Sequence, residues 1–139
     1  MCTNIRPELS EKNKYWIDKH RYYELKHFCL QYPVWKKSYL ALDGMSKRPN
    51  DLEFFTPTNS CGDPTARCAM AKSFYSERME IIERCAREAD PELAVYILRA
   101  VTEELSYTYL KNKLDIPCSK DTYYDRYRRF FWFLNKARQ

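Results

Sequence analysis

Glycine is nearly absent from this chain of 139 residues, which has only Gly44 and Gly62. The chain therefore has no glycine-rich loop of the kind that cradles phosphate groups, and it has no Gly-x-Ser-x-Gly nucleophile motif. It also lacks a run of about 18 apolar residues, which a membrane-spanning helix needs, and its first residues lack the apolar core of a signal peptide. Together with 31% charged residues, these absences predict a cytoplasmic protein of one compact domain.

Side chains that could bind a metal or catalyse a reaction are few. The chain has six cysteines but no Cys-x-x-Cys or Cys-x-x-His pair, and it has only two histidines. His20 and His27 share one face of a predicted helix with Glu24 between them, which could form a metal or acid-base cluster but is more typical of a solvent-exposed polar face. We therefore expect reduced and mostly buried cysteines, no metal or cofactor, and no enzymatic activity.

Apolar residues recur at spacings of three and four along most of the chain, and no run alternates strictly between apolar and polar residues. The sequence therefore predicts an all-α fold of about six helices. Residues 1–43 are expected to form a helical hairpin, in which Ser10 caps the first helix and Pro33 begins the second. Residues 44–64 are the expected loop or linker, because they hold both glycines and three of the seven prolines.

Residues 65–139 are expected to form a helical core. Asp63 precedes Pro64 and Asp90 precedes Pro91, and a capping side chain directly before a proline is a strong signal for the start of a helix. The helix after the second of these pairs is apolar nearly all round, which predicts that it lies in the core.

Residues 106–138 are predicted to form a helix-turn-helix. Ser106 can cap a short helix that ends before Pro117, and Ser119 can cap a longer second helix. Ile116 lies in the turn between them, where such a motif needs an inward apolar side chain. The chain from Ser106 to its end holds eight basic and three acidic side chains, so its net charge equals the +5 of the whole chain. This concentration of positive charge favours nucleic acid as the partner.

The second helix of this motif has two different faces when its residues are placed about 100° apart. The face expected in the core consists of Tyr123, Tyr127, Phe130 and Leu134, with Phe131 and Ala137 at its edges. The N-terminal residues of the other face are those that a groove-reading helix presents to base edges. The residues expected to read bases are Lys120, Thr122, Tyr124 and Arg128. Those expected to bind phosphate are Arg126 and Arg129.

The aromatic run from Phe130 to Phe133 extends around the whole circumference of this helix, and Trp132 lies on its polar side. Such a run requires something else to cover the end of the helix. The cover is either the N-terminal hairpin or a second copy of the chain.

Two stretches carry a resemblance to a known family. Residues 22–37 read YYELKHFCLQYPVWKK, and residues 114–134 read LDIPCSKDTYYDRYRRFFWFL. The first is similar to the early helix, ending in a Tyr-Pro pair, of phage late-gene transcriptional activators of the RinA and ArpU type. The second is similar to the apolar turn, capping serine and Thr-Tyr-Tyr start of their reading helix. The resemblance implies a C-terminal helix-turn-helix like that of bacterial sigma factors, and it adds Ser119 to the DNA-binding residues.

Three acidic residues depart from the pattern of that family. Asp115 stands where a glycine is common in the turn, and Asp121 and Asp125 oppose a strong grip on phosphate. We therefore expect one copy to bind double-stranded DNA modestly, which favours a homodimer or a partner such as RNA polymerase. The expected function is a DNA-binding transcription regulator of phage or prophage type, in the cytoplasm of a bacterial host.

The surplus of aromatic residues, which make up 16% of the chain, supports a second hypothesis. Tyr, Trp and Phe are typical anchors of protein interfaces. The alternative function is therefore that of a phage-encoded antagonist, which binds a host or defence protein through aromatic surfaces.

Overall fold

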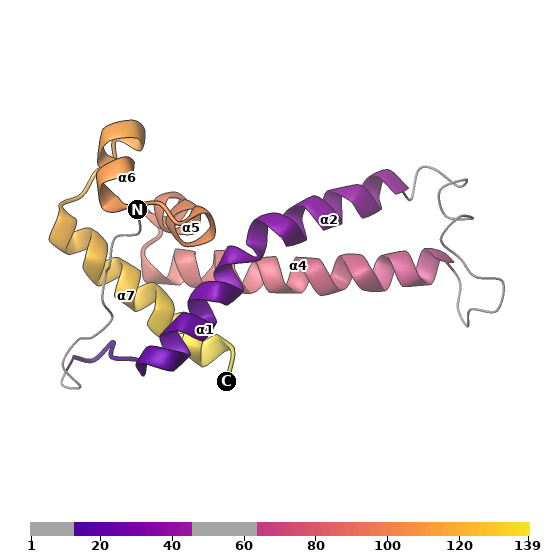
Figure 1. Ribbon diagram of the computed structural model, residues 1–139, viewed down its shortest axis with the longest axis horizontal. Coiled ribbons are helices and arrows are strands. Elements are labelled where there is room, and N and C mark those ends of the chain that lie inside the picture. The colour runs from indigo at the N-terminus through magenta and orange to yellow at the C-terminus, as the bar shows by residue number, and fades with distance from the viewer. Residues whose placement is uncertain (1–12, 46–63) are drawn as a thin grey trace. The chain divides into compact units, whose positions relative to one another are not determined.

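The computed structural model describes residues 13–45 and 64–139, and these residues form helices and no strand (Figure 1). The helices are α1 (Lys19–Leu30), α2 (Tyr32–Met45), α4 (Pro64–Ala89), α5 (Ala94–Glu103), α6 (Tyr107–Leu114) and α7 (Lys120–Ala137). The predicted all-α fold is confirmed. None of the described helices is long and apolar enough to cross a membrane.

The chain divides into two compact units, and the division differs from the expected one. The first, here called the terminal unit, contains residues 1–31 and 81–139, and the second, the middle unit, contains residues 32–80. The expected hairpin of residues 1–43 is thus split between the units, because α1 packs against α5 and α7 of the terminal unit. The expected loop of residues 44–64 lies largely outside the described residues.

The first helix begins later than expected. Ser10 lies outside the described residues, and the segment from Asn13 to Asp18 is not helical. The N-cap is Asp18, whose carboxylate accepts a hydrogen bond from the amide of His20 at 3.1 Å. The expected second helix is confirmed, since α2 begins one residue before Pro33.

The two predicted starts of helices in the second half of the chain have different outcomes. Helix α4 begins at Pro64, as expected. Asp90 instead stabilises a turn before α5, because its Oδ1 atom accepts hydrogen bonds from the amides of Glu92 and Leu93 at 2.9 and 3.3 Å. The prediction that α5 belongs in the core is confirmed for one side of the helix, where Ile97 is fully buried, but Val95 on another side is 67% exposed. The main contacts of α5 are with α1 and α7, and they leave Val95 exposed.

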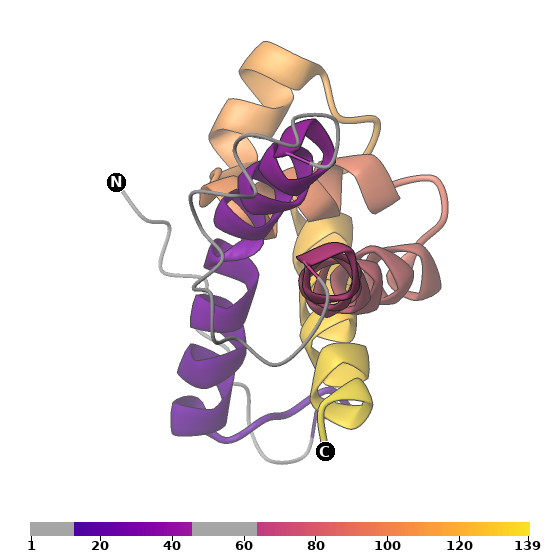
Figure 2. The same cartoon turned by 90° about the vertical axis from the view of Figure 1, so that its right-hand side faces the viewer.

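The core of the terminal unit lies where α1, α5 and α7 pack against one another (Figure 2). The predicted core face of α7 is confirmed, because its four central residues and Phe131 are buried, whereas Ala137 at its edge is exposed. The hydroxyls of Tyr22 in α1 and Tyr127 in α7 lie 2.9 Å apart in a buried hydrogen bond. Burial raises the pKa of Tyr127 well above its usual value, so this phenol stays neutral and both helices are joined by a bond between uncharged groups.

The middle unit contains α2 and the first part of α4. The thiol of Cys68 in α4 donates a hydrogen bond to the carbonyl of Leu42 in α2 at 3.7 Å. The ammonium of Lys72 lies 5.5 Å from the centre of the Tyr39 ring. These contacts join the two helices within the unit.

Candidate nucleic-acid interface

The two serines predicted to cap the helix-turn-helix both act as caps. Ser106 Oγ accepts a hydrogen bond from the amide of Tyr109 at 3.1 Å, at the start of α6. Ser119 Oγ accepts one from the amide of Thr122 at 3.2 Å, at the start of α7. Each cap satisfies an amide that the first turn of a helix leaves without a partner. The two caps therefore stabilise the first turns of α6 and α7.

The turn between these helices has the expected inward residue and a less expected backbone conformation. Ile116 is fully buried, and its amide donates to the carbonyl of Leu110 at 3.1 Å. Asp115 lies in the left-handed region, at φ 52° and ψ 50°. Glycine adopts this conformation without steric cost, and aspartate tolerates it better than most residues do. Asp115 thus ends α6 in the conformation that a glycine commonly provides at the end of a helix.

Tyr107 joins the two helices of the motif. Its hydroxyl donates a hydrogen bond to the carbonyl of Cys118 at 2.8 Å, and its ring lies 5.6 Å from that of Tyr123 and 6.4 Å from that of Tyr124. The first residue of α6 therefore fixes the start of α7. Sequence reasoning missed this role, and the only signal for it was an aromatic side chain directly after the capping Ser106.

Four of the predicted DNA-binding residues lie together at the N-terminal end of α7. Ser119, Lys120 and Thr122 are exposed, and the Ser119 hydroxyl donates to Thr122 Oγ1 at 2.9 Å. Tyr124 is half-buried, and the Lys120 ammonium lies 5.7 Å from the centre of its ring. This end of the helix presents hydroxyl groups, one cation and the carboxylate of Asp121 to solvent.

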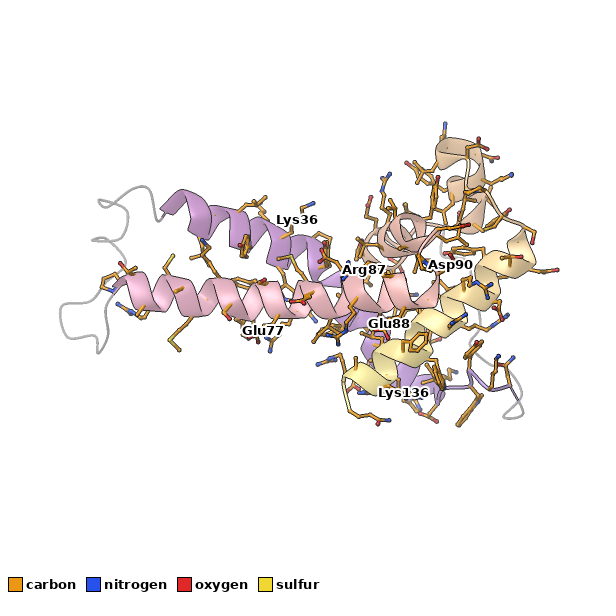
Figure 3. The ribbon with its side chains drawn as sticks, turned by 180° about the vertical axis from the view of Figure 1, so that it is seen from behind. Lys36, Glu77, Arg87, Glu88, Asp90 and Lys136 are labelled. Atoms are coloured by element: carbon orange, nitrogen blue, oxygen red, sulfur yellow. The ribbon has the colours of Figure 1, made fainter. Side chains whose placement is uncertain are left out.

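Arg126 lies in ion pairs within the protein. Its Nε atom donates to Asp90 Oδ2 at 3.0 Å, and its Nη1 atom donates to Asp125 Oδ2 at 2.6 Å. The hydrogen bond to Asp90 raises the pKa of the guanidinium above its usual value. Asp90 lies where the chain leaves α4 (Figure 3), so the pair links the turn before α5 to α7. The predicted contact of Arg126 with phosphate would require it to give up these carboxylates.

Arg128 and Arg129 are half-buried, and neither forms an ion pair with a described carboxylate. The Nε atom of Arg128 is buried and has no hydrogen-bond partner among the described residues. The guanidinium of Arg129 lies 5.6 Å from the centre of the Phe133 ring. Both side chains keep an uncompensated charge on the helix.

Two further cations lie in the first helix of the motif. Lys111 and Lys113 are exposed in the last turn of α6, and neither forms an ion pair with a described carboxylate. Sequence reasoning counted their charge but did not include them in the binding surface. They lie nine and seven residues before Lys120, in the first helix of the predicted motif. This position was the signal that could have added them to the predicted DNA-binding residues.

The possible metal ligands and nucleophiles of residues 13–45 and 64–139 include histidine, cysteine, aspartate and glutamate side chains. Within these ranges no group of three or more His, Cys, Asp and Glu side chains could hold a metal ion. The four cysteines that are described, Cys29, Cys68, Cys85 and Cys118, are reduced, and the first three are buried. Burial raises the pKa of the Cys85 thiol to about 11, so it stays protonated at neutral pH and is a poor nucleophile.

The fold and the interface define an all-α protein whose last two helices, α6 and α7, are joined by a capped turn at residues 115–119. Comparison of the chain with protein-family models, with curated proteins and with solved structures gave no match. The geometry of the described residues is therefore the basis for a proposed function.

Proposed function

We propose that this protein is a DNA-binding transcription regulator of phage or prophage type, which inserts the N-terminal turns of α7 into the major groove of duplex DNA. The observation that supports this best is the capped and exposed end of α7, where Ser119, Lys120 and Thr122 face solvent. A major groove about 12 Å wide admits a single helix, and the first residues of such a helix reach the base edges.

The unpaired cations of the motif support the same proposal. Between Lys111 and Arg129, five basic side chains form no ion pair with a described carboxylate: Lys111, Lys113, Lys120, Arg128 and Arg129. Cations of this kind displace the counterions of DNA phosphates, which makes binding favourable at low salt and weaker as salt rises. We assign base reading to Lys120, Thr122 and Tyr124, and phosphate binding to the two arginines and the two lysines of α6.

The acidic side chains of α7 limit the affinity of a single copy. Asp121 is exposed in the first turn of the helix, where it repels phosphate. A second copy of the chain, or a partner such as RNA polymerase, would add the contacts that one subunit lacks. The proposal therefore includes cooperative binding to promoter DNA.

A titration with labelled duplex DNA tests this function. Wild-type protein should retard prophage promoter DNA at micromolar concentration in low salt, and the double variant Arg128→Glu with Arg129→Glu should abolish the retardation. The matched control is Lys36→Glu with Lys37→Glu, two exposed cations of α2, which should leave binding unchanged; Figure 3 labels the first of them. The proposal fails if wild-type protein binds neither promoter DNA nor RNA polymerase.

The middle unit supports an alternative function, that of an antagonist which binds a host or defence protein. Met70 and Phe74 are 72% and 46% exposed and lie four residues apart on α4, while Val34 and Leu40 of α2 are 63% and 58% exposed. Large exposed apolar side chains are typical of protein-binding surfaces. A pull-down that survives nuclease treatment, loses its partner with Met70→Glu and Phe74→Glu, and keeps it with Arg128→Glu would favour this alternative.

A further inference from the structure

A second cationic surface lies toward the C-terminal end of α7, in the terminal unit. It consists of Lys14, Tyr15, Arg129, Trp132, Phe133 and Lys136, and is here called the Trp132 patch. The rings form a continuous row, with Tyr15 packed edge-on at 5.7 Å from Trp132, and Trp132 at 5.2 Å from Phe133. The N-terminal segment thus provides intramolecular cover for the aromatic run, although Trp132 and Phe133 remain half-buried.

Each ring of the patch carries a cation. The Lys136 ammonium lies 3.5 Å from the centre of the Trp132 ring, the Lys14 ammonium lies 4.9 Å from that of Tyr15, and Arg129 lies over Phe133. A ring face holds a cation in position without neutralising it. The patch is therefore a set of fixed positive charges in an apolar surrounding.

No carboxylate of the described residues compensates these charges. None of the three cations forms an ion pair with a described carboxylate. The nearby acidic side chains on the same elements have other partners: Asp125 binds Arg126, and Asp18 caps α1. The patch thus complements a ligand that brings negative charge.

The position of the patch separates it from the reading end of α7. At about 1.5 Å of rise per residue, Lys136 lies about 24 Å along the helix from Lys120, about twice the width of a major groove. Figure 3 shows Lys136 near the C-terminal end of α7. When the first turns of the helix occupy a groove, this end projects beyond it and stays accessible.

The chemistry of the patch fits a protein segment better than a second stretch of phosphate backbone. Phosphates need cations alone, whereas Trp, Tyr, Phe and Arg are the side chains that protein interfaces enrich. A ligand that used the whole surface would need both carboxylates and apolar side chains.

We infer that the Trp132 patch binds an acidic segment of a partner protein, in which Asp or Glu side chains alternate with Leu or Phe. The carboxylates bind Lys14 and Lys136, and the apolar side chains pack on the edges of Trp132 and Phe133. This interaction goes beyond the proposed function and requires no DNA. On DNA, it would bring a partner to the end of α7 that faces away from the groove.

Selection from a random displayed peptide library, in the absence of DNA, tests this inference. Peptides enriched by wild-type protein should be acidic and apolar, and the affinity of a labelled winner should fall at least about tenfold in the double variant Lys14→Glu with Lys136→Glu. The control Lys37→Glu, an exposed cation of the middle unit, should change it less than about twofold. A winner whose Asp and Glu are replaced by Lys should regain affinity for the double variant.

Three results would overturn the inference. The selection could give no peptide, it could give neutral or basic peptides, or the winners could bind the double variant as well as wild type. A DNA titration adds a fourth. If Lys136→Gln reduced by about one the slope of the logarithm of the DNA-binding constant against the logarithm of the salt concentration, the patch would be a phosphate-binding surface. Because Lys14 and Lys136 are exposed, the double variant and Lys136→Gln should keep the wild-type melting curve. Failure of wild-type protein to bind DNA would leave the peptide measurement unaffected.

Discussion

The two compact units differ in how much of their apolar surface they bury. In the terminal unit, Leu25, Ile97 and Phe130 have no exposed surface. In the middle unit, Met70 and Val34 keep 72% and 63% of theirs exposed. Burial of apolar area is the main source of stability, so we expect the terminal unit to be the more stable of the two units. The middle unit keeps exposed apolar surface that a binding partner could bury.

The largest expected effect tests this difference directly. Phe130→Ala should lower the free energy of unfolding of the terminal unit by about 3–5 kcal/mol, because it leaves a cavity in a core that cannot fully collapse. Phe74→Ala, the matched change at a half-exposed ring of the middle unit, should cost about 0.5 kcal/mol. Urea denaturation followed by circular dichroism measures both. Equal costs would show that the two units do not differ in this way.

The next effect concerns the ion pair that ties α7 into the terminal unit. Asp90→Ala removes the partner of Arg126 and the acceptor of two turn amides, and should cost about 2 kcal/mol. The control Glu88→Ala breaks only the exposed pair with Arg84 and should cost about 0.5 kcal/mol or less. A double-mutant cycle with Arg126→Ala isolates the coupling, and a coupling near zero would contradict a linking role for this pair.

The smallest effect lies at the reading end of α7. Ser119→Ala removes the N-cap and should cost about 1 kcal/mol, while Ser119→Asp, which can still accept from the Thr122 amide, should retain most of the stability. Hydrogen exchange should show faster opening of the first turn of α7 and no change in the middle unit. Loss of protection throughout the terminal unit would mean that this cap supports more than its own helix.

Much of the fold could be predicted because the signals were local. When a helix follows directly after a serine, the serine hydroxyl lies within reach of the amide three residues later. Ser106 and Ser119 were therefore correctly identified as caps. The same reasoning was less useful at the N-terminus, where Asp18 and not Ser10 precedes the first described helix. Several residues there can cap a helix, and local chemistry does not rank them.

The two faces of α7 were predicted correctly, but the partners of its charged side chains were not. Periodicity separated the buried face of α7 from its polar face, because a side chain's direction on a helix follows from its number. It could not identify Arg126 as the partner of Asp90, 36 residues earlier, nor reveal that Tyr107 binds the carbonyl of Cys118. A charge that looks free in a sequence is free only if the fold brings no opposite charge to it.

The sequence by itself determined the all-α class, the caps of α6 and α7, the buried aromatic face of α7 and the concentration of positive charge near the C-terminus. Each of these depends on contacts within a few residues or on composition alone. Only the tertiary structure decided which cations stay unpaired, that α1 joins α5 and α7 in one unit, and that Tyr15 packs on Trp132. These depend on contacts between residues far apart in the chain. Such contacts contribute stabilising energy only when the chain has folded.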